Sequence, residues 1–146
     1  PMVMSSFWFD GSDDGPPAAA DGTTTPVSCD NGWVCEHRWR TTANVVGFHD
    51  VTSGTGVTRW WSNGSTQIAF GRADRGYVAF NRDPATLMRT FETDLPAGTY
   101  CDVANGDLDA GSCTGPAYTV DSAGRFTASV PPDGMIALHV GARPRR

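Results

Sequence analysis

Residues 57–81 read VTRWWSNGSTQIAFGRADRGYVAFN. The residue pattern along Val57–Ser62, Thr66–Arg72 and Gly76–Asn81 repeats with a period of two, the spacing of a β-strand. Asn63-Gly64 lies between the first two runs, and this dipeptide is a strong signal for a tight hairpin turn. The stretch therefore predicts successive antiparallel strands.

The same pattern continues toward the C-terminus. Further short runs cover Thr86–Thr93, Thr99–Val103, Ala117–Val120, Arg125–Val130 and Met135–Val140, and the connections between them are rich in Gly, Pro, Asn and Asp. About eight short strands at roughly ten-residue spacing favour an antiparallel sandwich or barrel. The expected core residues are Ile68, Phe70, Val78, Phe80, Leu87, Phe91, Ile136 and Leu138.

The first third of the chain has a different character. Residues 1–9 are expected to be extended, and residues 10–32 form a long loop rich in Asp, Gly, Pro and Thr. Trp33–Phe48 is predicted as a helix that starts at Asp30 or Asn31 as N-cap and ends before Gly54. Its apolar face is formed by Cys35, Trp39, Ala43 and Val46. One strand and one helix cannot bury their apolar faces on each other alone, so this part needs a larger neighbour.

Length and composition exclude several classes. The 146 residues suffice for about one domain but not for a complete (β/α)8 barrel, which needs about 250 residues.

A net charge of −5 argues against nucleic-acid binding, and the basic tail of Arg143, Arg145 and Arg146 is expected to be solvated. No apolar run approaches the ~20 residues of a membrane span. No secretory leader opens the chain, so we expect a matured chain or one without its front.

The four cysteines are Cys29, Cys35, Cys101 and Cys113. Their spacings contain no zinc knuckle, and an even number fits disulfides formed in an oxidising compartment. We expect two local bridges, Cys29–Cys35 and Cys101–Cys113.

Several strings resemble the animal and actinobacterial type of α-amylase, glycoside hydrolase family 13. They are Val3–Phe7, Asp14–Pro17, Gly32–Arg40, Asn44–Phe48, Phe70–Arg72, Arg75–Asn81 and Leu95–Val103. The run Trp33-Val34-Cys35-Glu36-His37-Arg38-Trp39 is the most specific of them, and the resemblance covers nearly the whole chain.

The resemblance implies a mainly β fold. Residues 1–56 would be the remnant of the catalytic (β/α)8 barrel with its last helix, and residues 57–146 the family's C-terminal Greek-key β-sandwich. The parent would be a secreted enzyme that endo-hydrolyses α-1,4-glucosidic bonds of starch and glycogen with retention. Such enzymes use carboxylates about 5 Å apart. The family's catalytic residues and its calcium ligands lie before residue 1, so no catalytic residue and no metal ligand is assigned here, and this chain alone is expected to be inactive.

Many relatives also bind chloride, through a basic residue immediately before the string Val-Met-Ser-Ser. Here that position is Met2, whose thioether carries no charge and no N–H donor. The resemblance therefore implies a lost or weakened chloride site.

Candidate carbohydrate contacts are Trp39, Trp60 and Trp61, because sugars stack on exposed aromatic rings. Trp60 and Trp61 should point to opposite faces of a strand. The competing interpretation for each is packing. Asp13 and Asp14 are interpreted as turn residues, and Asp102, Asp107 and Asp109 lack the pattern of an EF-hand calcium loop. His37, His49 and His139 are too scattered to predict a metal site.

Three hypotheses remain open. In the first, the chain stabilises the missing N-terminal barrel of a starch-degrading enzyme. In the second, it is a non-catalytic sandwich that binds carbohydrate. In the third, it is a purely structural module or an orphan fragment. None involves nucleic acid or a membrane.

Overall fold

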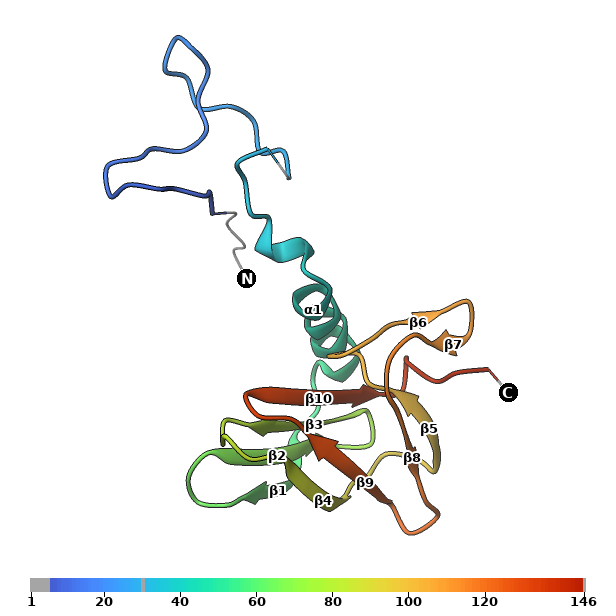
Figure 1. Cartoon of the computed structure of the whole chain (residues 1–146). Helices are drawn as coiled ribbons and strands as arrows, with labels where there is room; N and C mark the ends of the chain where they lie inside the picture. Colours follow the sequence, from blue (N-terminus) through green and yellow to red (C-terminus); the bar gives the residue numbers. More distant parts are fainter. Residues whose placement is uncertain (1–5, 30, 146) are drawn as a thin grey trace. The chain divides into compact units, whose positions relative to one another are not determined.

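The computed structural model describes residues 6–29 and 31–145. Its contacts divide the chain into two compact units, Pro1–Ala43 and Asn44–Arg146. Every strand of the described chain belongs to the second unit (Figure 1). The assignment of residues 1–56 to a barrel and of residues 57–146 to a separate domain stays a prediction.

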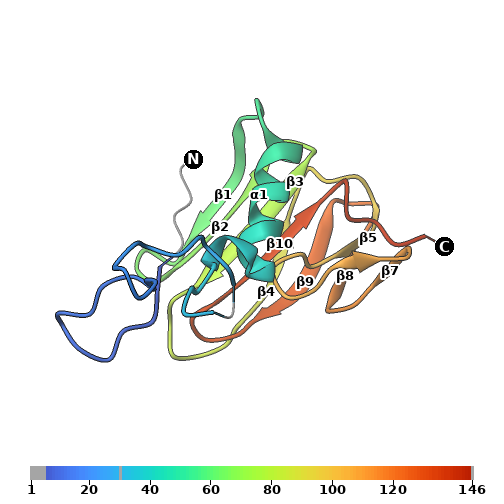
Figure 2. The same cartoon turned by 90° about the horizontal axis from the view of Figure 1, so that it is seen from above.

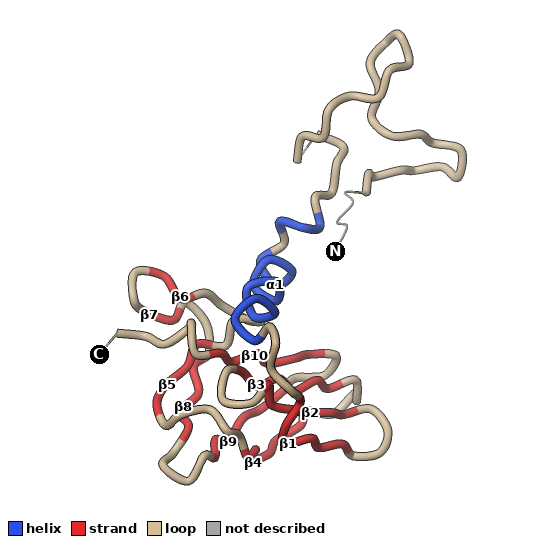
Figure 3. The backbone as a smooth tube through the Cα atoms, turned by 180° about the vertical axis from the view of Figure 1, so that it is seen from behind, coloured by secondary structure: helices blue, strands red, loops and turns tan. Residues whose placement is uncertain are grey.

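The first unit consists mainly of loops (Figure 3). Isolated bridges join Phe7 to Trp33 and Ala18 to Thr24, and a disulfide joins Cys29 to Cys35. Within its described residues only Cys35 is buried, which means that this unit has no hydrophobic core of its own.

The predicted helix over Trp33–Phe48 is wrong at both ends. A short 3₁₀ turn covers Glu36–Arg38, and the α-helix α1 covers Arg40–Thr52. Cys35 has a left-handed backbone with φ of +54° and is tied to Cys29, so regular helix cannot pass through it. Asp30 lies outside the described residues, and Asn31 is nine positions before the observed helix start.

The eight predicted strands are all present, with shifts of at most two residues at their ends. They are β1 (Val57–Ser62), β2 (Gln67–Arg72), β3 (Gly76–Asn81), β4 (Leu87–Glu92), β5 (Gly98–Cys101), β8 (Ala117–Val120), β9 (Arg125–Val130) and β10 (Gly134–His139). The sequence analysis missed the two-residue strands β6 (Leu108–Asp109) and β7 (Ser112–Cys113), which are too short for any periodicity to appear.

The strands form a two-layered antiparallel sandwich. One layer is a sheet in the order β1-β2-β3-β10, and the other contains the pairs β4–β9 and β5–β8. The chain crosses between layers after β3 and returns before β10, which pairs with β3 in full register. This is the mainly β architecture that the sequence predicted.

The core between the layers is built around three aromatic rings. Tyr77 lies 5.3 Å from Phe126 and 5.7 Å from Phe91, measured between ring centroids. Four predicted core residues belong here: Leu87, Phe91, Ile136 and Leu138.

Of the other predicted core residues of β2 and β3, Val78 is confirmed as buried, whereas Ile68, Phe70 and Phe80 are only partly buried. Val78 is buried, but in a second cluster on the opposite face of the sheet. Phe70 and Phe80 are only partly buried against that cluster, and Ile68 is also half-buried. The inward positions are instead Ala69, Tyr77 and Ala79. Both faces of these strands carry apolar residues, so alternation alone cannot tell which face points inward.

The C-terminal half of α1 lies over the four-stranded sheet (Figure 2). Gly76 permits this close approach, because a Cβ there would lie 2.6 Å from Thr52 Cγ2 and 2.8 Å from the Phe48 ring. Arg72 on β2 donates to the carbonyl oxygen of Thr52, the last residue of α1, at 3.4 Å and to that of Thr55 in the following loop at 2.7 Å, which ties the end of the helix to the sheet.

The second disulfide, Cys101–Cys113, closes the loop that contains β6 and β7. Beside it, the fully buried carboxylate of Asp102 accepts hydrogen bonds from the backbone N–H groups of Ala104 and Ala137, at 3.1 and 3.0 Å. Asn105 Nδ2 donates to the other oxygen at 2.6 Å. Burial raises the pKa of Asp102, although these hydrogen bonds oppose the shift. The carboxylate thereby connects β10 to the loop that follows β5.

Replacement of Asp102 by Ala should destabilise the protein by about 3 kcal/mol, because it removes the acceptor to which the buried backbone N–H groups of Ala104 and Ala137 donate. Urea unfolding of the 146-residue chain measures this loss. Asp109→Ala, at an exposed position of β6, is the matched control and should change the midpoint little. Equal midpoints for the two variants would contradict the role of the buried carboxylate.

Candidate functional site

Trp60 and Trp61 point to opposite faces of β1, as the strand period predicts. Trp60 is 60% exposed and stacks on Phe70, with 5.7 Å between ring centroids and 18° between ring planes. Trp61 is half-buried and meets Phe91 edge to face at 6.2 Å. The pairing register shifts between Thr58 and Trp61, where Arg59 has a φ of +50°, so β1 carries a bulge directly before the two rings.

The face that carries Trp60, which we call the outer face, is hollowed in two places. One hollow of about 190 Å³ lies between α1 and the sheet and includes Val45, Phe48 and Phe70. A larger one of about 690 Å³ has a floor of Ile68, Phe80 and Met135. Phe80 and Met135 line both hollows, so the two adjoin, and we call them together the outer-face groove.

The sequence analysis did not place these side chains in a site. Phe70 and Phe80 were assigned to the core, and Met135 was not singled out. The available signal was the apolar character of both faces of β2 and β3, which is typical of a sheet covered on both sides. Here α1 covers only part of the outer face, and Trp60 beyond it is largely exposed.

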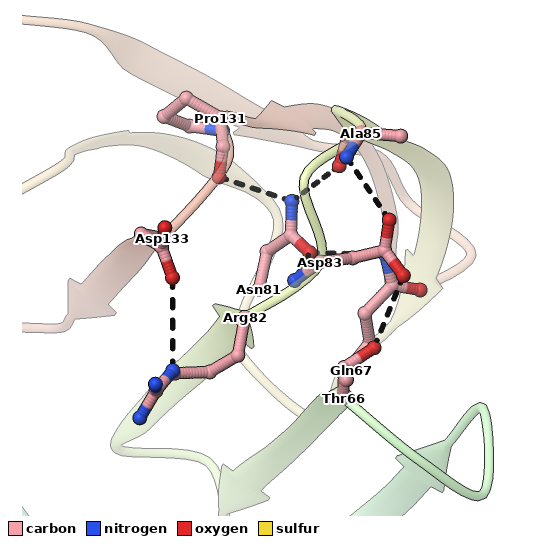
Figure 4. A network of polar contacts seen from close by, with 8 residues as sticks. All are labelled: Thr66, Gln67, Asn81, Arg82, Asp83, Ala85, Pro131 and Asp133. Carbon is pink, nitrogen blue, oxygen red and sulfur yellow. Dashed lines mark hydrogen bonds and ion pairs between the residues drawn. The ribbon is translucent and has the colours of Figure 1, made fainter.

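A polar network fixes the rim of the larger hollow (Figure 4). The buried Asn81 donates through Nδ2 to the carbonyl oxygens of Ala85 at 2.9 Å and Pro131 at 3.0 Å, and it accepts from Gln67 Nε2 at 3.0 Å. Arg82 pairs with Asp133 across the opening at 3.6 Å. Both partners of this pair are mostly exposed, so the pair contributes little stability, and Asn81 is the residue that holds the loops together.

Trp39 belongs to the first unit and is 56% exposed immediately before α1. With Trp8 and Trp33 it lines a hollow of about 290 Å³. Its expected place on a helix face is wrong, because it links the 3₁₀ turn to α1 in an extended conformation. A carbohydrate contact at Trp39, Trp60 or Trp61 stays a prediction.

Asp14 and Asp107 have structural partners. Asp14 accepts from the backbone N–H groups of Asp10 and Gly11, and these bonds lower its pKa, as expected for a turn residue. Asp107 accepts from Asn44 Nδ2 at 2.6 Å. Met2 lies outside the described residues, so the structure gives no information on the chloride position.

The three histidines are not brought together. His37 lies in the first unit and His49 is exposed, whereas His139 is buried beside the Phe48 ring at 6.1 Å. Over residues 6–29 and 31–145 no group of three or more His, Cys, Asp or Glu side chains is placed to hold a metal ion. In the same described part, no helix has the length and apolar character needed to cross a membrane.

Burial of His139 lowers its pKa, and its Nδ1 accepts the backbone N–H of Gly141 at 3.1 Å. The folded state therefore holds the neutral ring with the proton on Nε2. This histidine contributes stability that is present at neutral pH and is lost as the pH falls and the unfolded chain takes up the proton.

These features define a class: a disulfide-containing β-sandwich with an apolar outer face partly covered by one helix. The family model described as "Alpha amylase, C-terminal all-beta domain" matches residues 60–141, from β1 to just after β10. The chain therefore belongs to the family of α-amylase C-terminal all-β domains.

Known relatives agree with this assignment. The chain is 44% identical to the α-amylase of Oryzias latipes over 97% of its own length and 31% of the relative's. It is 49% identical to the α-amylase of Thermomonospora curvata over 97% of its length and 23% of the relative's. A crystal structure of a mutant α-amylase I from Eisenia fetida with maltohexaose matches 94% of this chain and 31% of that chain, with a TM-score of 0.83 and 39% identity. The chain thus spans about a third or less of these relatives.

His139→Gln should flatten the dependence of stability on pH below about 6.5, the ordinary pKa of histidine. In the unsubstituted chain the free energy of unfolding should fall between about pH 7 and pH 5 more steeply than in the variant. Urea unfolding at several pH values measures the slopes. His49→Gln, at an exposed position, should keep the original slope. Equal slopes for all three proteins would show that His139 titrates normally.

Proposed function

We propose that this chain is the C-terminal part of a secreted α-amylase and that it stabilises the catalytic part of the enzyme by covering apolar surface. The observation that carries the proposal is the outer-face groove together with the exposed Trp60. Burial of such a ring stabilises an interface by roughly 2–3 kcal/mol, whereas exposure in a lone domain contributes nothing.

The first unit supports the same proposal independently. Trp8, Phe9 and Trp39 are 76%, 66% and 56% exposed, and no core forms among the described residues 6–29 and 31–43. A segment with this composition gains stability only when its apolar side chains pack on a further neighbour. The neighbour proposed here is the remainder of an α-amylase, which in the matched relatives amounts to two-thirds or more of the chain.

The reaction of the whole enzyme follows from the family. It would be endo-hydrolysis of α-1,4-glucosidic bonds in starch or glycogen, with retention through paired carboxylates about 5 Å apart. Those carboxylates, the calcium ligands and any chloride site would lie in the part that this chain does not supply. The two disulfides support an oxidising, extracellular location.

A second candidate function is carbohydrate binding without catalysis. Trp60 favours it, because Phe70 stacks against the ring while the side chain remains largely exposed, as a sugar platform requires. The mainly apolar floor of the adjoining groove favours a protein surface over a sugar, since glucans need polar partners for their hydroxyl groups.

The 146-residue chain alone should release no reducing sugar from amylose. The physical reason is that two carboxylates at catalytic spacing belong to the proposed missing part. A reducing-end assay on the purified chain, with the whole α-amylase of Thermomonospora curvata as positive control, measures this. Activity of the chain alone would contradict the proposal that the catalytic carboxylates lie in the rest of the enzyme.

A chimaera tests the stabilising role. In it, this chain replaces the matched segment of the Thermomonospora curvata α-amylase. The chimaera should fold and hydrolyse starch, and Trp60→Glu should destabilise it by about 2 kcal/mol because a charge would then enter the interface. Met88→Glu is the matched control: Met88 is 75% exposed on β4 in the other layer and should tolerate the charge.

Thermal unfolding and activity of the chimaeras separate the outcomes. An insoluble or inactive chimaera would contradict the stabilising role. If the chimaera is fully active and Trp60→Glu and Met88→Glu change its stability equally, the outer face is not part of the interface with the catalytic part. Retention of the unmodified chain, but not of Trp60→Ala, on insoluble starch would favour the carbohydrate-binding alternative.

A further inference from the structure

Three asparagines of the chain are followed directly by glycine, in the pairs Asn31-Gly32, Asn63-Gly64 and Asn105-Gly106. Such a pair is the dipeptide most prone to spontaneous deamidation, because glycine has no side chain to shield its backbone nitrogen from the preceding side-chain amide. The reaction requires that this nitrogen can attack and that the amide carbon can approach it. The structure restrains the three pairs to different degrees.

Asn63-Gly64 is restrained at both reacting groups. Asn63 Oδ1 accepts three backbone N–H groups at 2.9 to 3.0 Å, those of Ser65, Thr66 and Gln67. The backbone N–H of Gly64 donates to Ser62 Oγ at 2.9 Å. These bonds orient the side-chain amide toward the turn and occupy the attacking nitrogen. Several hydrogen bonds must therefore break before the two groups can react.

Asn105-Gly106 is restrained by its side chain and by packing. Asn105 Nδ2 donates to Asp102 Oδ2 at 2.6 Å and to the carbonyl oxygen of Met135 at 2.8 Å. Gly106 is buried against Gly115, since a Cβ on Gly106 would lie 2.5 Å from the Gly115 nitrogen. The peptide group between Asn105 and Gly106 therefore has little room to turn toward the amide.

Asn31-Gly32 is not restrained at its reacting atoms by any described residue. Within residues 6–29 and 31–145 the Asn31 side chain makes no hydrogen bond, and the backbone N–H of Gly32 has no acceptor. Both residues are exposed in a turn, where Gly32 has a φ of +80°. The neighbouring main-chain bonds, from Asn31 N to the Ser28 oxygen and from Trp8 N to the Gly32 oxygen, leave the attacking nitrogen and the amide available.

We propose that Asn31 is a site of spontaneous deamidation, modified faster in the folded chain than Asn63 and Asn105. The Gly32 nitrogen forms a bond to Asn31 Cγ, and the bond between Cγ and Nδ2 breaks. The amide group leaves as ammonia, with the proton that the Gly32 nitrogen loses. Water then opens the resulting succinimide ring at one of its two C–N bonds and gives aspartate or isoaspartate.

The modification adds a carboxylate to the loop that the Cys29–Cys35 disulfide closes. Gly32 also lines the hollow that contains Trp8 and Trp39, so the new charge lies beside exposed aromatic rings. If these rings pack on the remainder of the enzyme, a charge there weakens the packing, because its burial costs hydration. This consequence rests on the proposed function, whereas the reaction at Asn31 does not.

Peptide mapping by mass spectrometry tests the proposal, because trypsin cleavage after arginine places the three asparagines in three different fragments. The folded 146-residue chain, with its disulfides intact, is incubated at mildly alkaline pH and sampled over several weeks. The fragment with Asn31 should gain the mass change of deamidation at least about ten times faster than the other two. Breaking one restraining hydrogen bond already accounts for a factor of about ten in rate.

The same chain in guanidinium chloride with a reducing agent is the matched control. Once unfolded, the three Asn-Gly pairs are equally exposed and should react at similar rates. Asn31→Gln should abolish the change in the first fragment and leave the rates at Asn63 and Asn105 as they were.

Equal rates at the three pairs in the folded chain would overturn the proposal, and so would faster reaction at Asn63 or Asn105. An Asn31 that stays unmodified in the folded chain but reacts in the unfolded chain would also overturn it. Activity and stability of the chimaera are measured independently, so each of these results leaves the proposed function standing.

Discussion

The close approach of α1 to β3 at Gly76 decides how the outer face is divided. Any larger residue there would collide with Phe48 and Thr52, and the helix could not lie flat on the sheet. Two polar anchors then hold the helix. Near its start, Asn44 donates to the carbonyl oxygens of Val103 and Gly106 and to Asp107. At its end, Arg72 donates to the carbonyl oxygens of Thr52 and of Thr55 just beyond the helix. With the helix fixed, one part of the apolar face is covered and the part around Trp60 is not.

The strands could be predicted because their signals are local. Turn residues such as Asn63-Gly64 and alternating side chains define each strand within about ten residues. The start of the helix could not be predicted in the same way. The disulfide from Cys29 holds Cys35 in a left-handed conformation, so the regular helix begins only at Arg40, although the apolar spacing around Cys35 and Trp39 suits a helix. A covalent constraint here overrides a periodic pattern.

The sites could be predicted only in part. Trp60 and Trp61 were recognised because two adjacent rings on a strand must face opposite ways. Their surroundings depend on pairs that are far apart in sequence, such as Trp60 with Phe70 and Arg89 with Trp61, and on which face of β2 points inward. The sequence alone does not show which face of a strand points inward when both faces are apolar.

The bulge in β1 has one more consequence, which concerns solubility. β1 is an outer strand of its sheet, and a straight outer strand offers a row of free peptide groups on which another chain can build a fibril. The left-handed residue Arg59 interrupts that row, and its charge remains half-exposed beside it. The bulge therefore protects this edge strand from cross-β aggregation, although the outer face of the protein carries exposed apolar side chains.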